Sequence, residues 1–294
     1  CQGFSMAGAR IRKNGFQEDP RNYLFKHYLN IVKIVSPKYF IFENVKGILT
    51  RSNGEIFKEI IKAFSNSDNF NGDKYYISYK IVKAIEVGIP QKRERVIIFG
   101  SKNKDIDFNF FYHQAYEKLK IERPDFLKDV TVWEAISNLP EANDNGKIKN
   151  PKSKTNYQKY LETDLEAINN HTKTNHSKKS LERMAKIKSG ENWTSLNEKI
   201  NSVHSGAYGR LSKNEPAPTI TTRFDTPSGG RFIHPVKNRT LTPREAARIQ
   251  SFPDNFNFIG SKSSICTQIG NAVPPKLAFF IACIIKEIEN EKNG

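Results

Sequence analysis

The spacing of hydrophobic residues predicts a helix near the start of the chain, over 19–36. Asp19 is suited to the N-cap, and Pro20 to the first helical position. Behind these caps, apolar side chains recur at helical spacing, at Leu24, Tyr28, Ile31 and Val35.

A short apolar run, 39–42, follows and predicts a buried strand that ends at Glu43 and Asn44. In open α/β sheets, ligands bind beyond the carboxyl ends of the strands. We therefore expect these two polar residues to lie at a binding edge.

The pattern continues as alternating helices and strands, which indicates an α/β fold. A helix is predicted over 53–65, and strands over 75–84 and 95–99. Thr242 and Glu245 have the spacing of a capping box with Pro243 between them, and a last helix is expected after 274–275. We expect an α/β body over 1 to about 140, a basic insertion over about 141–235 and a return segment after it.

Charge is concentrated in the insertion. The chain of 294 residues has 47 Lys+Arg and 31 Asp+Glu, a net charge of +16. Residues 147–213 contain 14 Lys+Arg and 6 Asp+Glu, which is a net +8 and half of the excess. Such a balance favours a polyanionic partner, most plausibly nucleic acid. The alternative is the generic Lys- and Asn-rich composition of a protein from an AT-rich genome.

Composition excludes several other classes. The longest apolar run, 277–285, is nine residues, whereas a membrane span needs about 20, so no membrane partner is expected. Three cysteines are too few for a disulfide framework and fit a reducing cytoplasm. The histidines lack the spacing of a zinc site, so no metal is predicted, and we expect His171 and His176 to lie on the solvated insertion.

Cys1 enters a loop that contains glycines at 3, 8 and 15. Its thiol would be a nucleophile if its surroundings lowered its pKa from about 8.5, although a lone cysteine is more often a small buried residue. The chain begins at this cysteine without a methionine, so we expect either that upstream sequence is missing or that the chain is processed.

Two further segments could contribute polar chemistry. Partial desolvation of Glu43 at the end of its strand would raise its pKa and let it act as an acid, but a capping or salt-bridging role is the simpler alternative. Strand alternation places Arg93 and Arg95 on one face, where paired guanidiniums suit a phosphate or a base carbonyl, or else form a solvated edge.

The order of these motifs resembles that of the cytosine-C5 DNA methyltransferases. Cys-Gln-x-Phe-Ser at 1–5 is followed by Glu-Asn-Val at 43–45 and Gln-x-Arg-x-Arg at 91–95. The remaining two motifs are the 239–254 stretch, with its Arg-x-Leu-Thr-x-Arg-Glu-x-Ala-Arg pattern, and Gln-x-Gly-Asn-Ala-Val-Pro-Pro at 268–275. Five motifs in this order make coincidence implausible.

The resemblance implies a Rossmann-like AdoMet-dependent methyltransferase sheet and a smaller, irregular, partly β target-recognition domain. The catalytic domain would be 1–140, the target-recognition domain and hinge 141–255, and the return to the catalytic domain 256–294. The enzyme would transfer a methyl group from S-adenosylmethionine to C5 of a cytosine that is flipped out of a specific site in double-stranded DNA. By resemblance, it would belong to a restriction-modification system.

The resemblance also implies roles for individual residues. Cys1 would attack C6, Glu43 would hold and protonate N3, and Asn44 would orient this region. Arg95 would bind O2 and Arg93 would assist it. AdoMet would contact Gly270, Asn271 and Ala272, and DNA would contact Gln2, Ser5, Arg10, Arg12, Thr219, Ile220 and Arg223.

One departure from the family pattern leaves alternatives open. The glycine loop Phe-x-Gly-x-Gly that opens the AdoMet-binding half is not in this sequence. The chain would then work with a separate N-terminal AdoMet-binding polypeptide, or be a DNA-binding subunit that is inactive without it. An RNA cytosine-5 methyltransferase is a further alternative, as is an amidohydrolase that uses an N-terminal cysteine, which leaves the downstream motifs unexplained.

Overall fold

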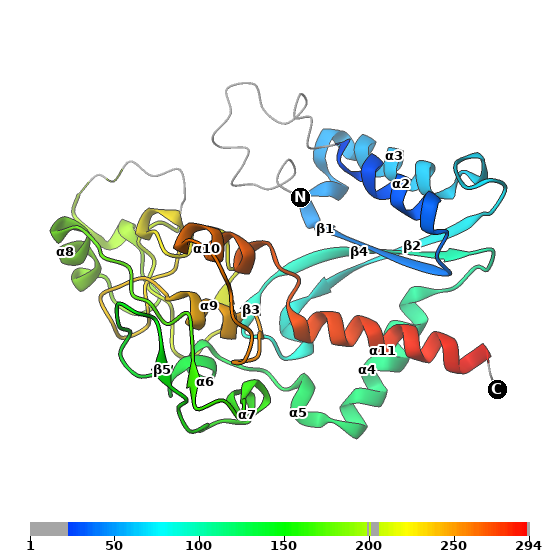
Figure 1. Cartoon of the computed structure of the whole chain (residues 1–294). Helices are drawn as coiled ribbons and strands as arrows, with labels where there is room; N and C mark the ends of the chain where they lie inside the picture. Colours follow the sequence, from blue (N-terminus) through cyan, green and yellow to red (C-terminus); the bar gives the residue numbers. More distant parts are fainter. Residues whose placement is uncertain (1–22, 199, 201–205, 293–294) are drawn as a thin grey trace. The chain divides into compact units, whose positions relative to one another are not determined.

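The computed structural model describes residues 23–198, 200 and 206–292, and these form two compact units (Figure 1). The first unit comprises the described residues of 1–83, 94–118 and 283–294. The second comprises those of 84–93 and 119–282. Each unit is treated separately below.

The first unit is an α/β layer structure. Its helices and strands are α2 (Phe25–Val35), β1 (Tyr39–Val45), α3 (Glu55–Ser65), β2 (Tyr75–Lys83), β4 (Glu94–Lys102), the first part of α4 (Phe108–Glu122) and the end of α11 (Pro275–Lys292). Short 3-10 turns connect them at Lys46–Leu49, Arg51–Gly54 and Ser67–Phe70. The predicted elements are therefore present; the residues proposed as caps of the first helix, Asp19 and Pro20, lie outside the described residues.

The described sheet has the strand order β1-β4-β2, and both ladders are antiparallel. β1 therefore ends beside the start of β4, with Val45 opposite Arg95. The expectation that Glu43 and Asn44 lie at an edge formed by carboxyl ends of parallel strands does not hold within this sheet, because its strands alternate in direction.

Aromatic side chains form the core on one face of this sheet. Helices α2 and α3 cover that face, where Phe40 packs on Phe64 and Tyr75 with ring centroids 4.8 and 5.2 Å apart (Figure 1). Gly100, opposite Phe40 on β4, has no room for a side chain, because a Cβ there would overlap the Phe40 ring. On the other face, Phe99 stacks on Phe108 of α4.

The second unit has short elements joined by long irregular connections. Its helices are α5 (Pro124–Leu127), α6 (Val132–Ile136), α7 (Asn156–Leu161), α8 (Lys178–Lys186), α9 (Pro243–Ile249) and α10 (Lys262–Asn271), besides the ends of α4 and α11. Its strands are β3 (Gln91–Lys92), β5 (Ile148–Lys149), β6 (Ala167–Ile168) and β7 (Ala217–Pro218), and it has 3-10 turns at Ala84–Val87, Trp193–Ser195 and Pro227–Gly229. Capping boxes start α6 at Thr131 and, as predicted, α9 at Thr242.

Two hydrophobic clusters stabilise the second unit. The larger one packs α6, α7, α9 and α10 around residues such as Ile136, Leu161 and Ile249. The smaller one surrounds Met184 of α8. Beside it, the buried Arg210 donates from all three guanidinium nitrogens to four backbone carbonyls and Asn238 Oδ1, at 2.6–2.8 Å. A single arginine thus links several loops that have little regular structure.

The last two helices contain a long apolar stretch. Residues Lys262–Glu291 are long and apolar enough to cross a membrane by length and composition alone. The stretch is divided into α10 and α11 by a break at 272–274, and a row of residues along α11 is buried at helical spacing: Leu277, Phe280, Ile284 and Ile288. These features are typical of a core helix, which passes the same test.

Candidate active site

Glu43 and Arg95 meet on one face of the β1–β4 ladder. Glu43 is opposite Ile97, and Val45 is opposite Arg95, so the two polar side chains are diagonal neighbours on the same face. Arg95 Nε lies 2.8 Å from Glu43 Oε1, and Arg95 Nη1 donates to the Glu94 carbonyl at 2.8 Å. The register of one antiparallel pair therefore brings together two candidates from separate sequence motifs.

This pair is mostly buried, but both side chains keep some exposure to water. The Glu43 side chain is 19% exposed and that of Arg95 is 12% exposed. Burial lowers the pKa of Arg95, and the Glu43 carboxylate opposes that shift. The Asn44 side chain lies on the other face of β1 and is buried, and its Oδ1 accepts a hydrogen bond from the Val45 amide at 2.9 Å. The pair can therefore present a carboxyl oxygen and a guanidinium to a ligand that enters from this face.

Arg93 does not share that face. It precedes β4 and belongs to the second unit, whereas Arg95 lies in β4 within the first. Its buried guanidinium donates to the Ala272 carbonyl at 3.0 Å and to the Ile220 carbonyl at 3.5 Å. The prediction of two guanidiniums side by side was wrong, because the strand begins only at Glu94.

Side-chain amides hold the segment that contains Arg93. The buried Gln91 accepts from the Ile220 amide at 2.8 Å and donates to Gln250 Oε1 at 2.8 Å. Gln250 in turn donates to the Ile269 carbonyl at 2.7 Å. Gln91 and Gln250 occur in two of the sequence motifs, but without a fold their spacing could not reveal that they pair.

The expected cofactor-binding residues differ in how accessible they are. A Cβ on Gly270 would come within 2.5 Å of the Thr221–Thr222 backbone, so this glycine serves close packing of α10 against that loop. Ala272 is half-buried, and its carbonyl accepts from Arg93. Asn271 is exposed and can present its amide to a ligand.

The expected DNA-contacting residues at 219–223 also divide. Ile220 is fully buried in the larger hydrophobic cluster, so its side chain anchors the loop and cannot contact DNA from there. Thr219 is half-buried and donates to the Lys92 carbonyl at 3.2 Å. Arg223 is exposed on the same loop. The other residues expected to contact DNA are Gln2, Ser5, Arg10 and Arg12. They lie outside the described residues, as does Cys1.

The basic stretch presents its lysines to solvent. Every lysine that the structure describes within 147–213 is exposed. The arginines behave differently, since Arg210 is buried and Arg183 pairs with Glu198 at 2.7 Å. Lysines thus supply the surface charge expected for contacts to phosphate.

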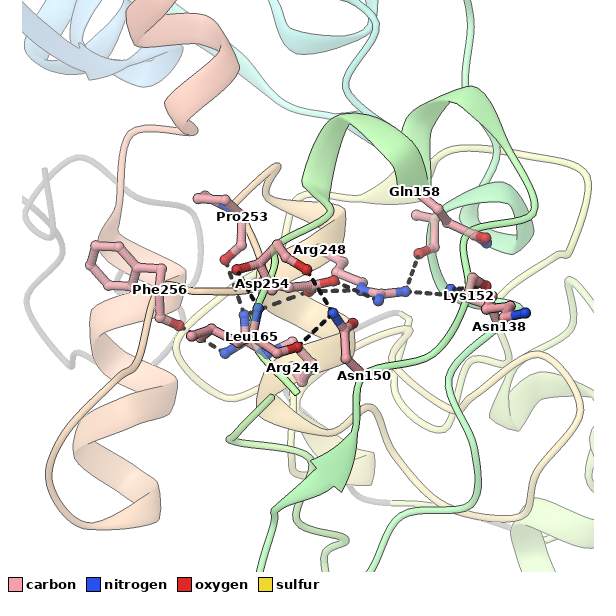
Figure 2. A network of polar contacts seen from close by, with 12 residues as sticks. Asn138, Asn150, Lys152, Gln158, Leu165, Arg244, Arg248, Pro253, Asp254 and Phe256 are labelled. Atoms are coloured by element: carbon pink, nitrogen blue, oxygen red, sulfur yellow. Dashed lines mark hydrogen bonds and ion pairs between the residues drawn. The ribbon is translucent and has the colours of Figure 1, made fainter. Parts of the chain in front are cut away.

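The 239–254 motif forms a buried ion network. Arg248 donates to both carboxyl oxygens of Asp254 at 2.9 and 2.7 Å, and Figure 2 shows Arg244 approaching the same carboxylate. Arg244 also donates to the carbonyls of Asn169 and Phe256 at 2.8 and 2.7 Å. Arg239 pairs with Glu245 through two bonds of 2.8 Å. The arginines of this motif therefore connect loops and are not available to DNA.

This network predicts a loss of stability in acid. Burial alone would raise the pKa of Glu245, but Arg239 outweighs it and holds that pKa at about 2. Burial lowers the pKa of His234 to about 4. Because both folded pKa values lie below the unfolded ones, the unfolded state takes up protons first. As the pH falls, protonation of each group lowers the free energy of unfolding by about 3 kcal/mol. This loss occurs between about pH 6.5 and 4 for His234 and between about pH 4.5 and 2 for Glu245.

Urea unfolding at pH 7, 5 and 3 measures this dependence. We expect the free energy of unfolding to fall at each step, and the loss between pH 7 and 5 to shrink in His234→Gln. Equal unfolding free energies at pH 7 and pH 3 would contradict the assignment.

Two histidines of the insertion, His171 and His176, are more buried than expected. His171 is fully buried, with Nδ1 3.0 Å from Thr242 Oγ1 and Nε2 3.0 Å from the Pro140 carbonyl. His176 is half-buried, with Nε2 3.1 Å from Thr240 Oγ1. The expectation for both was wrong, because the insertion folds over the start of α9. In the described part of the chain, no group of three or more His, Cys, Asp or Glu could hold a metal.

Comparisons with known proteins identify the family of this chain. A sequence model described as C-5 cytosine-specific DNA methylase matches residues 1–287. The Type II methyltransferase M1.HphI of Haemophilus parahaemolyticus is 33% identical over 99% of this chain and 68% of its own length. M.DdeI of Desulfomicrobium norvegicum is 33% identical over 96% of this chain and 69% of its own length. The chain thus spans about two thirds of these relatives.

Solved structures show the same fold. An Escherichia coli prophage protein described as a DNA modification methyltransferase has a TM-score of 0.68 and 28% identity, covering 94% of this chain and 76% of its own. The S. pombe Dnmt2 methyltransferase has a TM-score of 0.54 and 15% identity, covering 92% of this chain and 74% of its own, which supports the fold alone. The expected methyltransferase fold is therefore confirmed.

Proposed function

Because the chain belongs to the C-5 cytosine-specific DNA methylase family, and is thus a DNA cytosine-5 methyltransferase, we propose that Glu43 and Arg95 bind the target cytosine while Cys1 attacks it. The observation that carries this proposal is the ion pair of Glu43 and Arg95 on one face of the sheet. These groups match the edge of cytosine, where the carboxyl would meet N3 and the guanidinium would meet O2.

The chemistry requires covalent activation, because C5 of cytosine is a poor nucleophile. The Cys1 thiolate forms a bond to C6, and the electron pair of the C5–C6 double bond moves to C5. A proton from Glu43 to N3 neutralises charge that would otherwise build up on the ring. Once C5 carries the methyl group, loss of the C5 proton to a base, cleavage of the S–C6 bond and return of the N3 proton to Glu43 restore the aromatic ring, the thiolate and the acid.

Arg95 and Arg93 have separate roles in this proposal. Arg95 donates to O2 of the cytosine and keeps Glu43 in place through the contact of 2.8 Å. Arg93 holds the segment before β4 against the Ala272 carbonyl and so acts as a positioning residue. Asn44 orients the end of β1 through its bond to the Val45 amide.

The family implies that S-adenosylmethionine is used, and the C-terminal motif fits part of such a site. AdoMet supplies the methyl group when it is bound. The exposed amide of Asn271 can hydrogen-bond a polar ligand, and Ala272 is fixed beside it by Arg93. Gly270 supports these two residues through its packing against 221–222 and does not contact the ligand in this proposal.

We assign DNA recognition to the 141–255 segment. Its exposed lysines would contact phosphate, and Arg223 and Thr219 lie on a loop where base edges or the backbone could be contacted. Flipping the target base out of the duplex costs a few kcal/mol, which these contacts offset. The loop after Cys1, with Arg10 and Arg12, would support the opened strand.

The relatives bear on the biological context. They are named Type II methyltransferases, and we propose that this enzyme likewise belongs to a restriction-modification system in the bacterial cytoplasm. They contain the matched sequence within single longer polypeptides, which does not support a separate AdoMet-binding polypeptide. The description of the family favours DNA over the RNA alternative.

The substrate is tested by measuring tritiated-methyl transfer by the full-length protein to duplex DNA and, separately, to tRNA. We expect label in cytosine of the DNA and background label in the tRNA. Adding salt should weaken DNA binding steeply, because the exposed lysines release counterions from phosphate. Methylation of tRNA without methylation of DNA would overturn the assignment.

A further inference from the structure

Lys276 is a buried lysine in the first turn of α11 that the mechanism above does not use. Its side chain is among the largest that are fully buried, and the residue is 1% exposed. Three aromatic rings surround the ammonium, with centroids 4.6 Å from Nζ for Phe126, 5.5 Å for Tyr157 and 5.4 Å for Tyr160. In the sequence, Lys276 is a single lysine between Pro275 and an apolar run, and this position is the only signal that it is buried.

The ammonium connects this helix to the segment 84–93. Lys276 Nζ donates to the Gly88 carbonyl at 2.9 Å, and its backbone amide donates to Ser251 Oγ at 3.1 Å. Gly88 has a φ of +64°, and a Cβ there would lie 2.6 Å from Nζ and 2.5 Å from the Phe126 carbonyl. The glycine therefore lets the backbone approach the lysine closely.

Several contacts hold the segment 84–93 to the rest of its unit, and Lys276 makes one of them. Others are the Gln91–Gln250 bond, the bonds of Gln91 and Arg93 to the backbone of residue 220, and the bond from Arg93 to the Ala272 carbonyl. The same segment contains Gln91 and Arg93 and leads directly into Arg95. A shift of the backbone at Gly88 would therefore also move Gln91, Arg93 and Arg95, because only a few residues of chain separate them.

No described carboxylate bonds to this ammonium. The charged and titratable groups that face it are the two cage tyrosines and Arg123, whose guanidinium lies 5.6 Å from the Phe126 ring. Burial, and to a lesser extent Arg123, lowers the pKa of Lys276 to about 7. The cation is thus retained by a carbonyl and ring faces alone, which makes it easy to deprotonate.

We propose that Lys276 is a positioning residue for methyl transfer, whose side-chain nitrogen in the aromatic cage fixes Gly88 and with it the segment 84–93. This inference rests on the proposed function of Gln91, Arg93 and Arg95. Because burial lowers the pKa of Lys276, protonation favours a state in which the segment opens and the ammonium reaches water. The segment is therefore held most firmly above neutral pH and opens more readily as the pH falls through about 7.

Amide hydrogen exchange in the segment, measured without substrate, tests this inference. The amides of Gly88 and Ile89 bond to the carbonyls of Ile85 and Ala84 and report opening of the turn. After correction for intrinsic exchange rates, we expect protection of the wild type to rise about tenfold between pH 6 and pH 8.5, because the buried lysine has a lower pKa in the closed segment than in the opened one. Lys276→Met should give low protection at both pH values.

The matched control is Lys286→Met, which removes an exposed lysine from the same helix and should behave as the wild type. In the full-length protein, the part of the pH dependence of the methyl-transfer rate that follows the Lys276 titration should be absent in Lys276→Met and present in Lys286→Met. Equal protection in wild type and Lys276→Met at both pH values would overturn the inference. Inactivity of the wild type with normal pH-dependent protection would instead contradict the proposed function.

A second measurement requires no variant. With ¹³C-labelled lysine, the ε-carbon signal of Lys276 should titrate near pH 7, and protection at Gly88 should increase over the same pH range, whereas exposed lysines titrate at about 10.4. A midpoint near 10, or protection that does not change through the Lys276 titration, would overturn the inference even if Lys276→Met failed to fold.

Discussion

Replacing Glu43 with Gln is expected to lower the rate of methyl transfer by about 10²–10⁴, the usual contribution of a general acid. The amide can still hydrogen-bond the cytosine ring but cannot give a proton to N3. It also leaves the guanidinium of Arg95, only 12% exposed, without its carboxylate partner. Single-turnover methylation of duplex DNA by the full-length protein measures this loss at the chemical step.

The matched control is Glu94→Gln. Glu94 lies on β4 next to Arg95 and pairs with Lys46 at 3.0 Å, but this ion pair is largely exposed. We expect its rate to stay within about twofold of the wild type, because exposed ion pairs contribute little. If both variants lost activity equally, or if Glu43→Gln kept the wild-type rate, Glu43 would not be the acid.

The second large effect concerns stability. Asp254→Asn should lower the free energy of unfolding by about 3–5 kcal/mol, the usual cost of leaving one charge of a buried ion pair alone. Asp254 accepts two bonds from Arg248, and both side chains are 2% exposed or less. An amide can accept only one of these bonds, and its NH₂ group would face the guanidinium. Urea or thermal unfolding of the variant measures the loss.

A double-mutant cycle separates the interaction energy of the Arg248–Asp254 pair from the effect of changing each buried side chain alone. Arg248→Met combined with Asp254→Leu should be less destabilised than the sum of the single variants, since neither charge is then left alone. Glu215→Gln, in the exposed pair with Lys92, serves as the control that should leave stability unchanged. Additive losses in the double variant would show that the two side chains do not act as a pair.

Local patterns predicted much of the fold of this chain. The strand at 39–42, the helix at 53–65 and the capping box at Thr242 all depend on neighbouring residues, and each is present. The prediction for Arg93 failed because its position depends on residues that are distant in the sequence. Its position depends on where β4 begins and on carbonyls of residues 220 and 272, which are distant in the sequence.

The charge count was misleading in a similar way. The net charge of +16 includes arginines that the fold buries against carboxylates and carbonyls, such as Arg210, Arg244 and Arg248. Lysines of the 147–213 stretch remain exposed and support the DNA proposal. Sequence alone distinguishes the two groups poorly, because burial of an arginine depends on loops that converge only after folding.

The measurement that tests the central claim most directly is methyl incorporation by Cys1→Ser in the full-length protein. A serine hydroxyl has no thiolate to add to C6, so we expect no tritiated methyl in duplex DNA while DNA binding persists. The wild type should incorporate label at C5 of cytosine. Retained incorporation by Cys1→Ser would contradict covalent catalysis by this cysteine.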